Sequence, residues 1–585
     1  MKKLKRTVDD ILFLLRPAMK FGKGLLLLML VIEALPALVN SLVTVAVPKV
    51  AIDGLLNGTP VGRIILNVGV LILTQLAASV ATNLLAYGYQ IKQTEFSLSI
   101  TKLILSQTIA TDYRFLDKPE YYAKYQLTYQ QFATGSQNIF YSFVSLLGAL
   151  LTCAAMFTVI ALLGPWVVLI VVAGTAAQVL VGLKGVKYEM QMSREVTEKT
   201  RGINYGSRML QERQYAADMK VSSMGTYVLG WVDRYIGWIK SVYVRFTRPR
   251  AAVNTVSSLL NHATTLGTIA YVVWGISAGQ IGSIGDYAAL IAAGTTLSTQ
   301  LRQLFGIFTD MARTAIQAEQ AREFFDLPSV IESSTGETPP KGPLSLELRD
   351  VSFAYPESDF CLKHLNLRIE PGEKIGIVGE NGAGKSTLAK LLLRLYDADS
   401  GDILYNGKPI REWDVHELRR RVGIAFQDAN LYALTLRENL QYYNPEATDE
   451  QRRKALKTVG LDRLDDLDKT VSREFLEDGI MLSGGETQKL ALARLLMDDF
   501  GLMILDEPSS ALDPLAEYKM TRLMFGVSNT TTIMIAHRLS TIRDADRIYL
   551  ISGGEVAEQG THEELMEMNG KYAEMFRRQA ENYTK

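Results

Sequence analysis

The chain has 585 residues, 48% of them hydrophobic, and its 62 Lys and Arg are balanced by 62 Asp and Glu. A formal net charge of zero gives no bulk electrostatic reason to expect nucleic acid as a partner. The length allows roughly three or four domains, and two distant cysteines, Cys153 and Cys361, indicate neither a disulfide framework nor a metal cluster.

The apolar residues gather in the N-terminal half, in runs near the roughly 20 residues that a helix needs to cross a bilayer. The first run is too long for a cleavable signal and lacks a small-residue cleavage site. Residues 7–19, with apolar side chains among charges, are expected to form an interfacial helix before it. Six spans are predicted, at 24–47, 64–87, 139–163, 166–183, 251–277 and 287–308.

Basic residues predict the orientation of these spans. Lys and Arg precede the first span and populate residues 184–250, whereas the turn at 164–165 and residues 279–286 contain none. The positive-inside rule therefore places both chain termini on the cytoplasmic side. Two long polar connections, 88–138 and 184–250, would then extend into the cytoplasm, where they could simply be solvated helices.

Three ionisable residues lie inside predicted spans, namely Glu33, His262 and Arg302. Such residues are unfavourable in a bilayer and are functional candidates by default, although Glu33 and Arg302 could instead be structural partners. A stretch rich in Ser, Thr, Gly and Pro at 332–343 predicts a linker. The expected division is a transmembrane domain at 1–328, a linker at 329–343 and a C-terminal domain at 344–585.

Residues 379–386 read Gly-Glu-Asn-Gly-Ala-Gly-Lys-Ser, which fits the phosphate-binding pattern G-x-x-x-x-G-K-[ST]. An apolar run predicts a buried strand before this loop, and a helix is expected after it. Backbone N–H groups would converge on a polyphosphate at the start of that helix. Lys385 is expected to reach the β- and γ-phosphates, and Ser386 to hold Mg²⁺. The predicted nucleotide-binding residues of the loop are Gly379, Asn381, Gly382, Gly384, Lys385, Ser386 and Thr387.

A second motif follows at 502–507, where Leu-Met-Ile-Leu precedes Asp506 and Glu507. Four apolar residues without alternation favour a strand buried on both faces of a parallel sheet, and ligands bind at the carboxyl ends of such strands. Asp506 is expected to hold the magnesium, and Glu507 to accept a proton from the water that attacks the γ-phosphate. Alone, the pair could be two solvated carboxylates; the upstream loop favours the catalytic interpretation.

With these two motifs behind an apolar half, the chain resembles the ABC transporter ATPase family. The signature of that family is present at 482–486 as Leu-Ser-Gly-Gly-Glu. Ser483, Gly484 and Gly485 open a helix and make another anion site, which by resemblance closes over the γ-phosphate bound to a second, facing ATPase domain. The signature commonly ends in Gln, so Glu486 is a departure. Its negative charge near the phosphates is expected to slow this closure without abolishing it.

The resemblance also implies roles for residues outside these motifs. Tyr355 would stack on the adenine, and Gln427 would sense the magnesium and the attacking water. The segment 510–513, which begins at Ser510 and ends at Asp513, would cross between the two ATPase domains. His537 would contact the γ-phosphate, which completes a predicted catalytic set of Glu507, His537 and Gln427 and a predicted metal set of Ser386, Gln427 and Asp506.

The resemblance further implies that the two polar connections are intracellular loops, with short helices near 112–123 and 211–220 that dock on ATPase domains. Six spans are also the count for one membrane domain of the family's exporters. The expected fold is therefore an all-α six-helix transmembrane domain followed by an α/β P-loop ATPase domain of the ABC type.

The leading functional hypothesis is an exporter half that works in the plasma (inner) membrane as a dimer with a second half-transporter, using ATP and Mg²⁺. Its termini and ATPase domain would be cytoplasmic. A homodimer is preferred and a heterodimer stays open; the transported substrate is not indicated. An importer built on the exporter fold is the main alternative. A non-hydrolysing ATP-gated regulator is disfavoured by Glu507 and His537, and a soluble ATPase by the six spans.

Overall fold

The computed structural model describes residues 2–278, 283–356, 361–474, 477–508 and 512–584. The chain forms two compact units. The first comprises Met1–Ile109 and Lys118–Leu327, and the second comprises Ala110–Asp117 and Pro328–Lys585. The short segment at 110–117 is therefore grouped with the C-terminal half, although it is far away in sequence.

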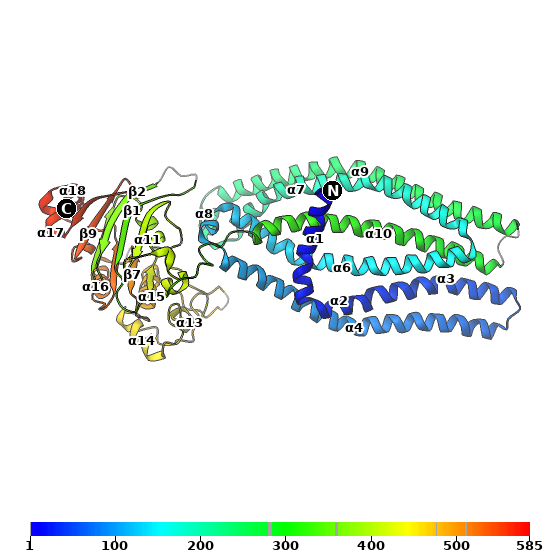
Figure 1. Ribbon diagram of the computed structural model, residues 1–585, viewed down its shortest axis with the longest axis horizontal. Helices are drawn as coiled ribbons and strands as arrows, with labels where there is room; N and C mark the ends of the chain where they lie inside the picture. Colours follow the sequence, from blue (N-terminus) through cyan, green and yellow to red (C-terminus); the bar gives the residue numbers. More distant parts are fainter. Residues whose placement is uncertain (1, 279–282, 357–360, 475–476, 509–511, 585) are drawn as a thin grey trace. The chain divides into compact units, whose positions relative to one another are not determined.

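The described part of the first unit is helical, and its long helices run side by side (Figure 1). Its elements are α1 Lys2–Phe21, α2 Lys23–Met29, the π-helix η1 Leu30–Ala34, α3 Leu35–Leu56, α4 Val61–Ala110, α6 Pro119–Leu163, α7 Pro165–Gln211, α8 Arg213–Val221, α9 Met224–Ser277 and α10 Ile284–Phe325. Each of the six predicted spans lies within α4, α6, α7, α9, α10 or the continuous run from α2 to α3, so the expected six-helix domain is confirmed.

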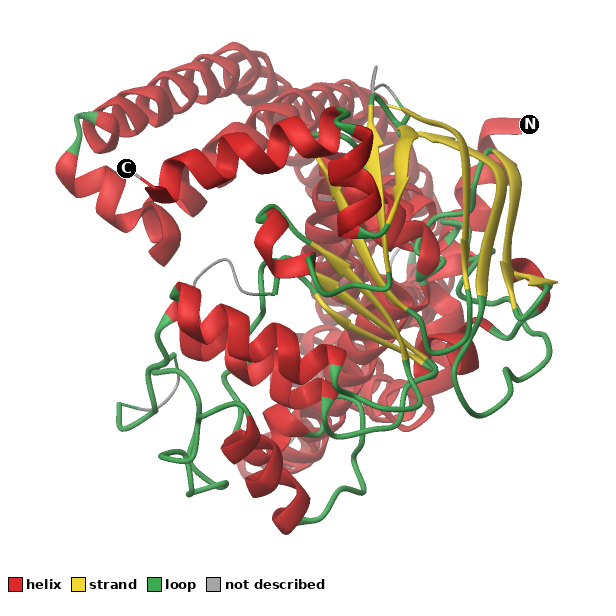
Figure 2. Ribbon diagram, turned by 90° about the vertical axis from the view of Figure 1, so that its left-hand side faces the viewer, coloured by secondary structure: helices red, strands yellow, loops and turns green. Residues whose placement is uncertain are grey.

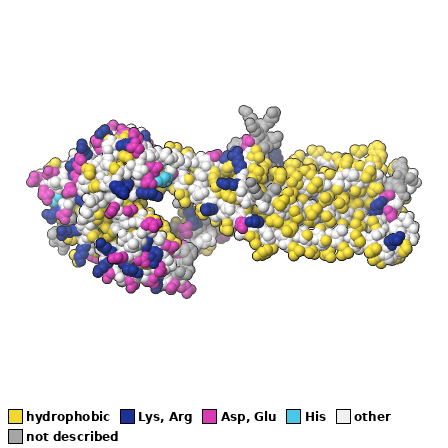
Figure 3. All heavy atoms as spheres, turned by 60° about the horizontal axis from the view of Figure 1, so that its bottom comes forward, with side chains coloured by type: hydrophobic (Ala, Val, Ile, Leu, Met, Phe, Trp, Pro, Cys, Tyr) yellow, Lys and Arg dark blue, Asp and Glu magenta, His cyan; other side chains and the backbone are white. Residues whose placement is uncertain are grey.

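Among the described residues, four stretches are long and apolar enough to cross a membrane, namely Leu27–Leu56, Val61–Ala110, Thr134–Leu163 and Pro165–Val196. The other two predicted spans lie in α9 and α10, which fall short of the same measure over their described residues because Ser, Thr, Asn and Gln interrupt their apolar runs. Figure 3 shows hydrophobic side chains over much of the visible surface of the long helices. Such a surface suits helices that face lipid.

Small residues bring the helices of this unit close together. A Cβ on Gly174 of α7 would overlap the Thr264 side chain of α9, and one on Gly185 would lie 3.2 Å from Val253. Close approach through small residues is typical of helices that associate in membranes, because van der Waals contact is their main source of stability there. A buried apolar cluster then joins α3, α6, α7, α9 and α10.

The first predicted span contains a π-helical turn at Leu30–Ala34, which includes Glu33. Pro36 follows this turn and cannot donate a backbone hydrogen bond, so the helix widens just before it. The widened turn lies against α6, since a Cβ on Gly148 would be only 3.2 Å from the Ala34 Cα atom. Such π-helical turns are frequent at functional sites.

An ion-pair group ties α3 to the start of α10. Lys49 contacts the Asp286 carboxylate and lies 3.6 Å from Asp53 Oδ2. The backbone N–H of Gly285 donates to Asp53 Oδ1 at 3.1 Å. A Cβ on Gly285 would overlap that carboxylate, so glycine is what allows the hydrogen bond.

The second unit contains two sheets, whose strands lie beside each other in Figure 2. One has the strand order β2-β1-β4-β5 and is antiparallel; the other has the order β10-β9-β3-β8-β7-β6 and is parallel except for β10. The strands are β1 Leu346–Ala354, β2 Cys361–Ile369, β3 Lys374–Gly379, β4 Ser400–Tyr405, β5 Lys408–Pro409, β6 Val422–Ala425, β7 Leu502–Asp506, β8 Thr531–Ile535, β9 Arg547–Ser552 and β10 Glu555–Gly560.

Helices accompany the sheets, as expected for an α/β ATPase domain. They are α5 Tyr113–Leu116, α11 Lys385–Leu392, η2 Ile410–Glu412, α12 Val415–Arg420, α13 Leu436–Leu440, α14 Asp449–Thr458, α15 Gly484–Leu495, α16 Pro514–Phe525, η3 Leu539–Ile542, α17 His562–Met568 and α18 Lys571–Thr584.

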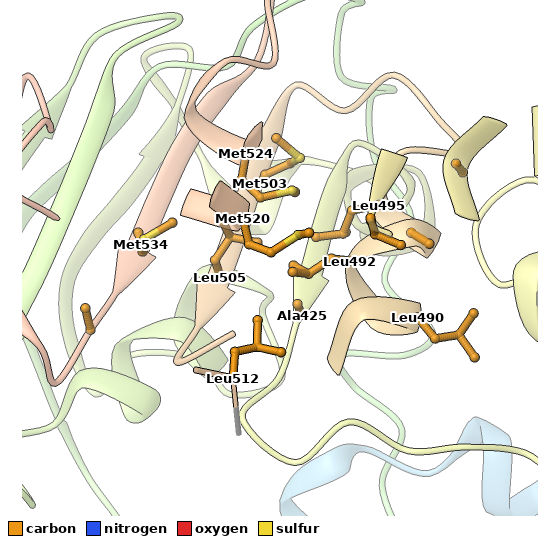
Figure 4. Packing of buried hydrophobic residues seen from close by; sticks show 14 of the residues in the cluster. Ala425, Leu490, Leu492, Leu495, Met503, Leu505, Leu512, Met520, Met524 and Met534 are labelled. Atoms are coloured by element: carbon orange, nitrogen blue, oxygen red, sulfur yellow. The ribbon is translucent and has the colours of Figure 1, made fainter. Parts of the chain in front are cut away.

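The central strand β7 is buried on both faces, as its uniform apolar run predicts. Met503 and Leu505 face one apolar cluster, which Figure 4 shows with Met520 and Met524 of α16. Leu502 and Ile504 alternate with them and belong to the second cluster, which fills the space between the two sheets. The strand therefore holds its carboxyl end, where Asp506 and Glu507 follow, in a firmly packed frame.

The first residues of the expected linker pack on the second unit. The buried Asp112 carboxylate accepts hydrogen bonds from the backbone N–H groups of Val330, Ile331 and Glu332 at 3.1, 2.9 and 3.0 Å. The Glu332 carboxylate accepts two further bonds from Arg419, at 2.8 and 2.9 Å. The stretch at 329–343 was predicted as a linker, and these contacts attach its first residues to the second unit.

Candidate functional site

The predicted phosphate loop has the expected strand–loop–helix context. β3 ends at Gly379, and α11 begins at Lys385 after Gly384, which adopts a left-handed φ of 105°. Glycine takes this conformation without steric strain. A Cβ on Gly379 would overlap the Ile551 carbonyl oxygen of β9, so this position also requires glycine.

A cavity of about 510 Å³ lies over this loop, within the range of small-molecule sites. Its lining residues are Asn381, Gly382, Gly384, Lys385, Ser386, Thr387, Gln427, Glu507 and His537. Each of these was predicted from sequence to bind nucleotide or to act in hydrolysis. The fold therefore brings together four separate sequence segments around one space.

Lys385 is buried, and its ammonium group donates to the carbonyl oxygens of Gly379 at 2.9 Å and Glu380 at 3.1 Å. Burial lowers the pKa of Lys385, and the nearby Glu507 and Asp506 charges oppose this shift. The lysine is thus held inside its own loop by neutral acceptors. An anionic phosphate is a stronger acceptor than a backbone carbonyl and would compete for this ammonium group.

Asp506 is 4% exposed, and burial raises its pKa, opposed by a hydrogen bond from Ser386. Its Oδ1 atom has no hydrogen-bond partner in the part of the chain that the structure describes. A buried carboxylate oxygen beside a hydroxyl is the hard oxygen donor set that Mg²⁺ prefers. In the described residues no group of three His, Cys, Asp or Glu could hold a metal alone. Nucleotide-bound Mg²⁺ needs only one or two protein oxygens with the phosphates, so the residues fit it.

Glu507 follows β7 with a left-handed φ of 48°, unusual for a residue with a side chain. Its backbone N–H donates to the Ile535 carbonyl at 3.0 Å, and its carboxylate contacts His537 Nε2. Strained backbone of this kind clusters at functional sites. The arrangement places a carboxylate and an imidazole side by side on the cavity wall.

Gln427 and Tyr355 differ in their relation to the cavity. Gln427 is exposed just after β6 and lines it. Tyr355 is not among the lining residues; its ring packs edge-on against Tyr396 at 5.4 Å, and its hydroxyl lies 3.3 Å from Thr387 Oγ1. Stacking of Tyr355 on an adenine remains a prediction.

The signature residues begin α15 and do not line the cavity. Ser483 is the N-cap and accepts from the Glu486 backbone N–H, while the Glu486 carboxylate accepts from Ser483 in return. Ser483 and Gly484 are exposed, and Gly485 is half-buried. An exposed helix N-terminus outside the cavity of its own chain suits contact with an anion on another molecule.

Asp513 is the N-cap of α16 and accepts from the backbone N–H groups of Leu515 at 3.0 Å and Ala516 at 2.9 Å. These bonds, led by the one from Ala516, hold its pKa below the usual range. The predicted crossing segment includes Ser510, which lies outside the described residues. Helix capping is thus the observed role of Asp513.

Of the ionisable residues in the spans, Glu33 lies in the π-helical turn and is exposed. Arg302 donates to Thr299 Oγ1 on the preceding turn of α10 at 3.3 Å. His262 is exposed on α9. The observed contact of Arg302 is thus within its own helix. The structural alternative had been a pairing of Arg302 with Glu33.

Short helices occur where docking helices were predicted. α8 covers 213–221 in the first unit, and α5 covers 113–116 in the second. α5 is joined to the rest of the second unit by Tyr113, which packs edge-on on Tyr396 at 5.7 Å, and by Asp117, which accepts from the Tyr396 hydroxyl at 2.8 Å. Lys390 of α11 lies 3.6 Å from Asp117 and over the rings of Tyr113 and Tyr355.

Sequence reasoning missed this cluster, because an isolated Lys or Tyr carries no local pattern that predicts contact with a distant loop. It links α5 to α11, the helix that follows the phosphate loop. The segment 110–117 is therefore a structural part of the domain that holds the cavity.

Comparison with known proteins gives one family model, several curated relatives and a solved structure. Residues 362–510 match the family model described as ABC transporter. The chain is 36% identical over 332 residues to the beta-(1-->2)glucan export ATP-binding/permease protein NdvA of Nitrobacter winogradskyi, over 55% of this chain and 54% of that protein. It is 37% identical over 303 residues to an ATP-dependent lipid A-core flippase of Alkalilimnicola ehrlichii, over 50% of this chain and 51% of that protein.

A third relative is the mitochondrial iron-sulfur clusters transporter atm1 of Neurospora crassa, 33% identical over 369 residues, which are 60% of this chain and 51% of that protein. The chain spans about half the length of these curated relatives. A solved structure of a bacterial Atm1-family ABC exporter with ATP bound matches 96% of this chain and 98% of that chain, with a TM-score of 0.79 and 24% identity. This likeness is one of fold.

Proposed function

We propose that the chain is one half of an ATP-driven exporter, from the premise that residues 362–510 match the ABC transporter family model and that the chain has the fold of a solved exporter of that family. The observation that carries the proposal is the single cavity in which the phosphate loop, Gln427, Glu507 and His537 meet, on a chain with membrane-length apolar helices. A nucleotide site on such a chain supports the use of ATP turnover for membrane work.

The residues of the cavity divide the work of hydrolysis. The loop amides and Lys385 bind and orient the triphosphate. Ser386, Asp506 and Gln427 would hold Mg²⁺, which supplies charge neutralisation when bound. Glu507 accepts the proton of the attacking water, a role that needs a carboxylate within hydrogen-bond reach. His537 contacts Glu507 and orients it on the cavity wall.

The site needs a second molecule to be complete. The signature helix is exposed and lies outside the cavity of its own chain, so its N-terminus is available to the nucleotide of a facing domain. The protein therefore acts as a dimer, and we favour a homodimer because this chain retains the loop, Glu507, His537 and the signature serine. Both termini and the ATPase domain are cytoplasmic by the distribution of Lys and Arg.

Export is favoured over import by the relatives, two of which are named for export or flipping. Their named cargoes differ from one another, as glucan, lipid A-core and iron-sulfur clusters do. Similarity of this kind does not select one cargo for this chain, and Glu33, His262 and Arg302 stay candidates for contact with it.

The test uses the full chain, purified alone and placed in lipid nanodiscs. Glu507→Gln should lower Mg-ATP hydrolysis by at least about 100-fold, because the general base is lost, while binding of a fluorescent ATP analogue is kept. Lys385→Ala should instead weaken that binding. Turnover near the wild-type rate in Glu507→Gln would remove Glu507 from catalysis. If the wild-type chain binds ATP but is inactive alone, the second half-transporter is a different chain.

A further inference from the structure

Glu486, which stands where the signature commonly has glutamine, is held by hydrogen bonds on both of its carboxylate oxygens. Oε2 of Glu486 accepts from the Ser483 backbone N–H and hydroxyl, both at 3.0 Å. Oε1 accepts from Nε of Arg463 at 2.9 Å and from a second guanidinium nitrogen. Both oxygens of the carboxylate are therefore occupied, one by the signature serine and the other by an arginine from a distant loop.

Arg463 is held in place by its neighbours. It lies in the loop after α14, between Leu461 and Leu464, which are both buried. The loop backbone is thus pinned to the core, while the arginine side chain is 56% exposed and reaches Glu486, which is 24% exposed. A guanidinium fork on one carboxylate oxygen fixes its position more narrowly than a single flexible ammonium would.

Glu486 is ionised at neutral pH and therefore needs compensation. Hydrogen bonds from the Ser483 backbone and from Arg463 hold its pKa below the ordinary range of glutamate. An uncompensated carboxylate would repel incoming phosphate oxygens. It would also hold the single hydroxyl proton of Ser483 more tightly than a glutamine amide, because charged acceptors make stronger hydrogen bonds.

We propose that Arg463 is a positioning residue of the signature face, which neutralises Glu486 and so leaves the Ser483 hydroxyl able to turn to the γ-phosphate of a nucleotide on the facing ATPase domain. The pair Arg463–Glu486 thereby performs the task of the glutamine that is usual at the end of the signature. This inference rests on the proposed function, since it assumes hydrolysis at a dimer interface.

The test is a double-mutant cycle on the full chain in nanodiscs, with kcat and KM for Mg-ATP measured separately. The variants are Arg463→Ala, Glu486→Gln, the two together, and Arg463→Lys. Arg578→Ala is the matched control, because it removes a similarly exposed arginine that binds Glu574 at 2.6 Å on α18, outside the cavity and the signature. Thermal unfolding of each variant reports on folding, and exposed ion pairs contribute little to it.

Arg463→Ala should lower kcat/KM by roughly tenfold, mainly through KM, because closure on bound nucleotide is impaired. Arg463→Lys should lie between this variant and wild type, since it keeps the charge and loses the fork. In the Glu486→Gln background, loss of Arg463 should change kcat/KM by less than about twofold. Arg578→Ala should match wild type.

An equal loss from Arg463→Ala in both backgrounds would overturn the proposal, because Arg463 would then act independently of Glu486. Wild-type kinetics in Arg463→Ala would overturn it as well. Absence of ATPase activity from wild type and Glu486→Gln alike would overturn the proposed function of this chain as a homodimer, and the inference with it. Failure of the inference and failure of the proposed function can be told apart, because only the second leaves no ATPase activity in any variant.

Discussion

At the scale of single residues, two features at the cavity reduce the stability of the folded domain. Asp506 is buried with one oxygen that has no partner among the described residues, and Glu507 adopts a left-handed backbone conformation beside it. Both features disfavour the folded domain. They occur at the positions where the proposed function needs charge, so that function would work against stability.

The variant Asp506→Asn tests whether the buried charge lowers stability while it supports hydrolysis. Burial raises the pKa of Asp506, so its ionised form is disfavoured in the folded state, and stability is lost as pH rises through the carboxylate range. Removing the charge should stabilise the nucleotide-free ATPase domain by about 1–2 kcal/mol at neutral pH and lower Mg-ATP hydrolysis by at least about 100-fold. Thermal unfolding and ATPase rates of the full chain measure both effects.

The matched control is Asp499→Asn, an exposed carboxylate just before β7, which should change neither quantity. A lower unfolding temperature in Asp506→Asn would contradict the claim that burial of the Asp506 charge destabilises the domain. Repeating the unfolding at acidic pH, where Asp506 is protonated in wild type too, should make the two proteins converge.

Much of the site could be predicted from sequence because the chemistry lies in short motifs. Lys385 and Glu507 each follow directly on a local pattern, and the parallel sheet brings the patterns to one edge. Arg463 could not be predicted, since its partner is fixed by a loop packed through Leu461 and Leu464. Tyr355 was placed by resemblance, and its contacts with Thr387 and Tyr396 depend on side-chain packing that sequence spacing does not encode.

At the scale of helices, the tie between α3 and α10 depends on one glycine. The Asp53 carboxylate accepts the Gly285 N–H, and Lys49 links it to Asp286. Helix position alone would not predict this tie, because the charged residues lie at the ends of two spans far apart in sequence. The tie is sterically possible only because residue 285 has no side chain.

Gly285→Ala should therefore destabilise the first unit by about 1–3 kcal/mol, because the new methyl group overlaps the Asp53 carboxylate. Gly306→Ala on the same helix is the matched control. A Cβ there meets nothing within 4 Å, so this variant should be neutral or stabilising by up to about 1 kcal/mol through helix propensity. Thermal unfolding in nanodiscs compares the two. Equal effects would show that the tie contributes nothing.

Helix existence was predictable from long apolar runs, while helix detail was not. The six spans lie in helices as expected, yet the π-helical turn before Pro36 gave no signal in the apolar pattern. The residues at 329–343 read as a linker by composition. Asp112 and Arg419 attach the first of them to the second unit, and composition does not reveal such partners.

At the scale of the whole molecule, the boundary of the ATP-binding domain lies before the apparent linker. Ile331 is buried, Glu332 binds Arg419, and the Ser334 hydroxyl accepts from the buried Arg394 at 3.0 Å. Glu337 pairs through its backbone with residues at 412 and 414. A domain cut at residue 344 would lose all of these contacts, including one partner residue each of Arg394 and Arg419.

A fragment of residues 328–585 should consequently be more stable than one of residues 344–585, by about 3 kcal/mol from the buried Ile331 side chain and the hydrogen bonds of Glu332, Ser334 and Glu337. Urea unfolding of both fragments, followed by Trp413 fluorescence, measures the difference. A third fragment that begins at residue 320 should gain nothing further, since 320–327 belong to the first unit. Equal midpoints for 328–585 and 344–585 would contradict the assigned boundary.

The membership of 110–117 in the second unit also bears on biosynthesis. The ribosome delivers Asp112 and Tyr113 well before it delivers Val330 and Tyr396, their partners. During that interval the connection between α4 and α6 has no docking surface, and its partners appear only as the C-terminal half emerges. Completion of the ATP-binding domain is thus linked to an N-terminal loop already in place, so an error in inserting α4 or α6 would also leave that domain without one of its parts.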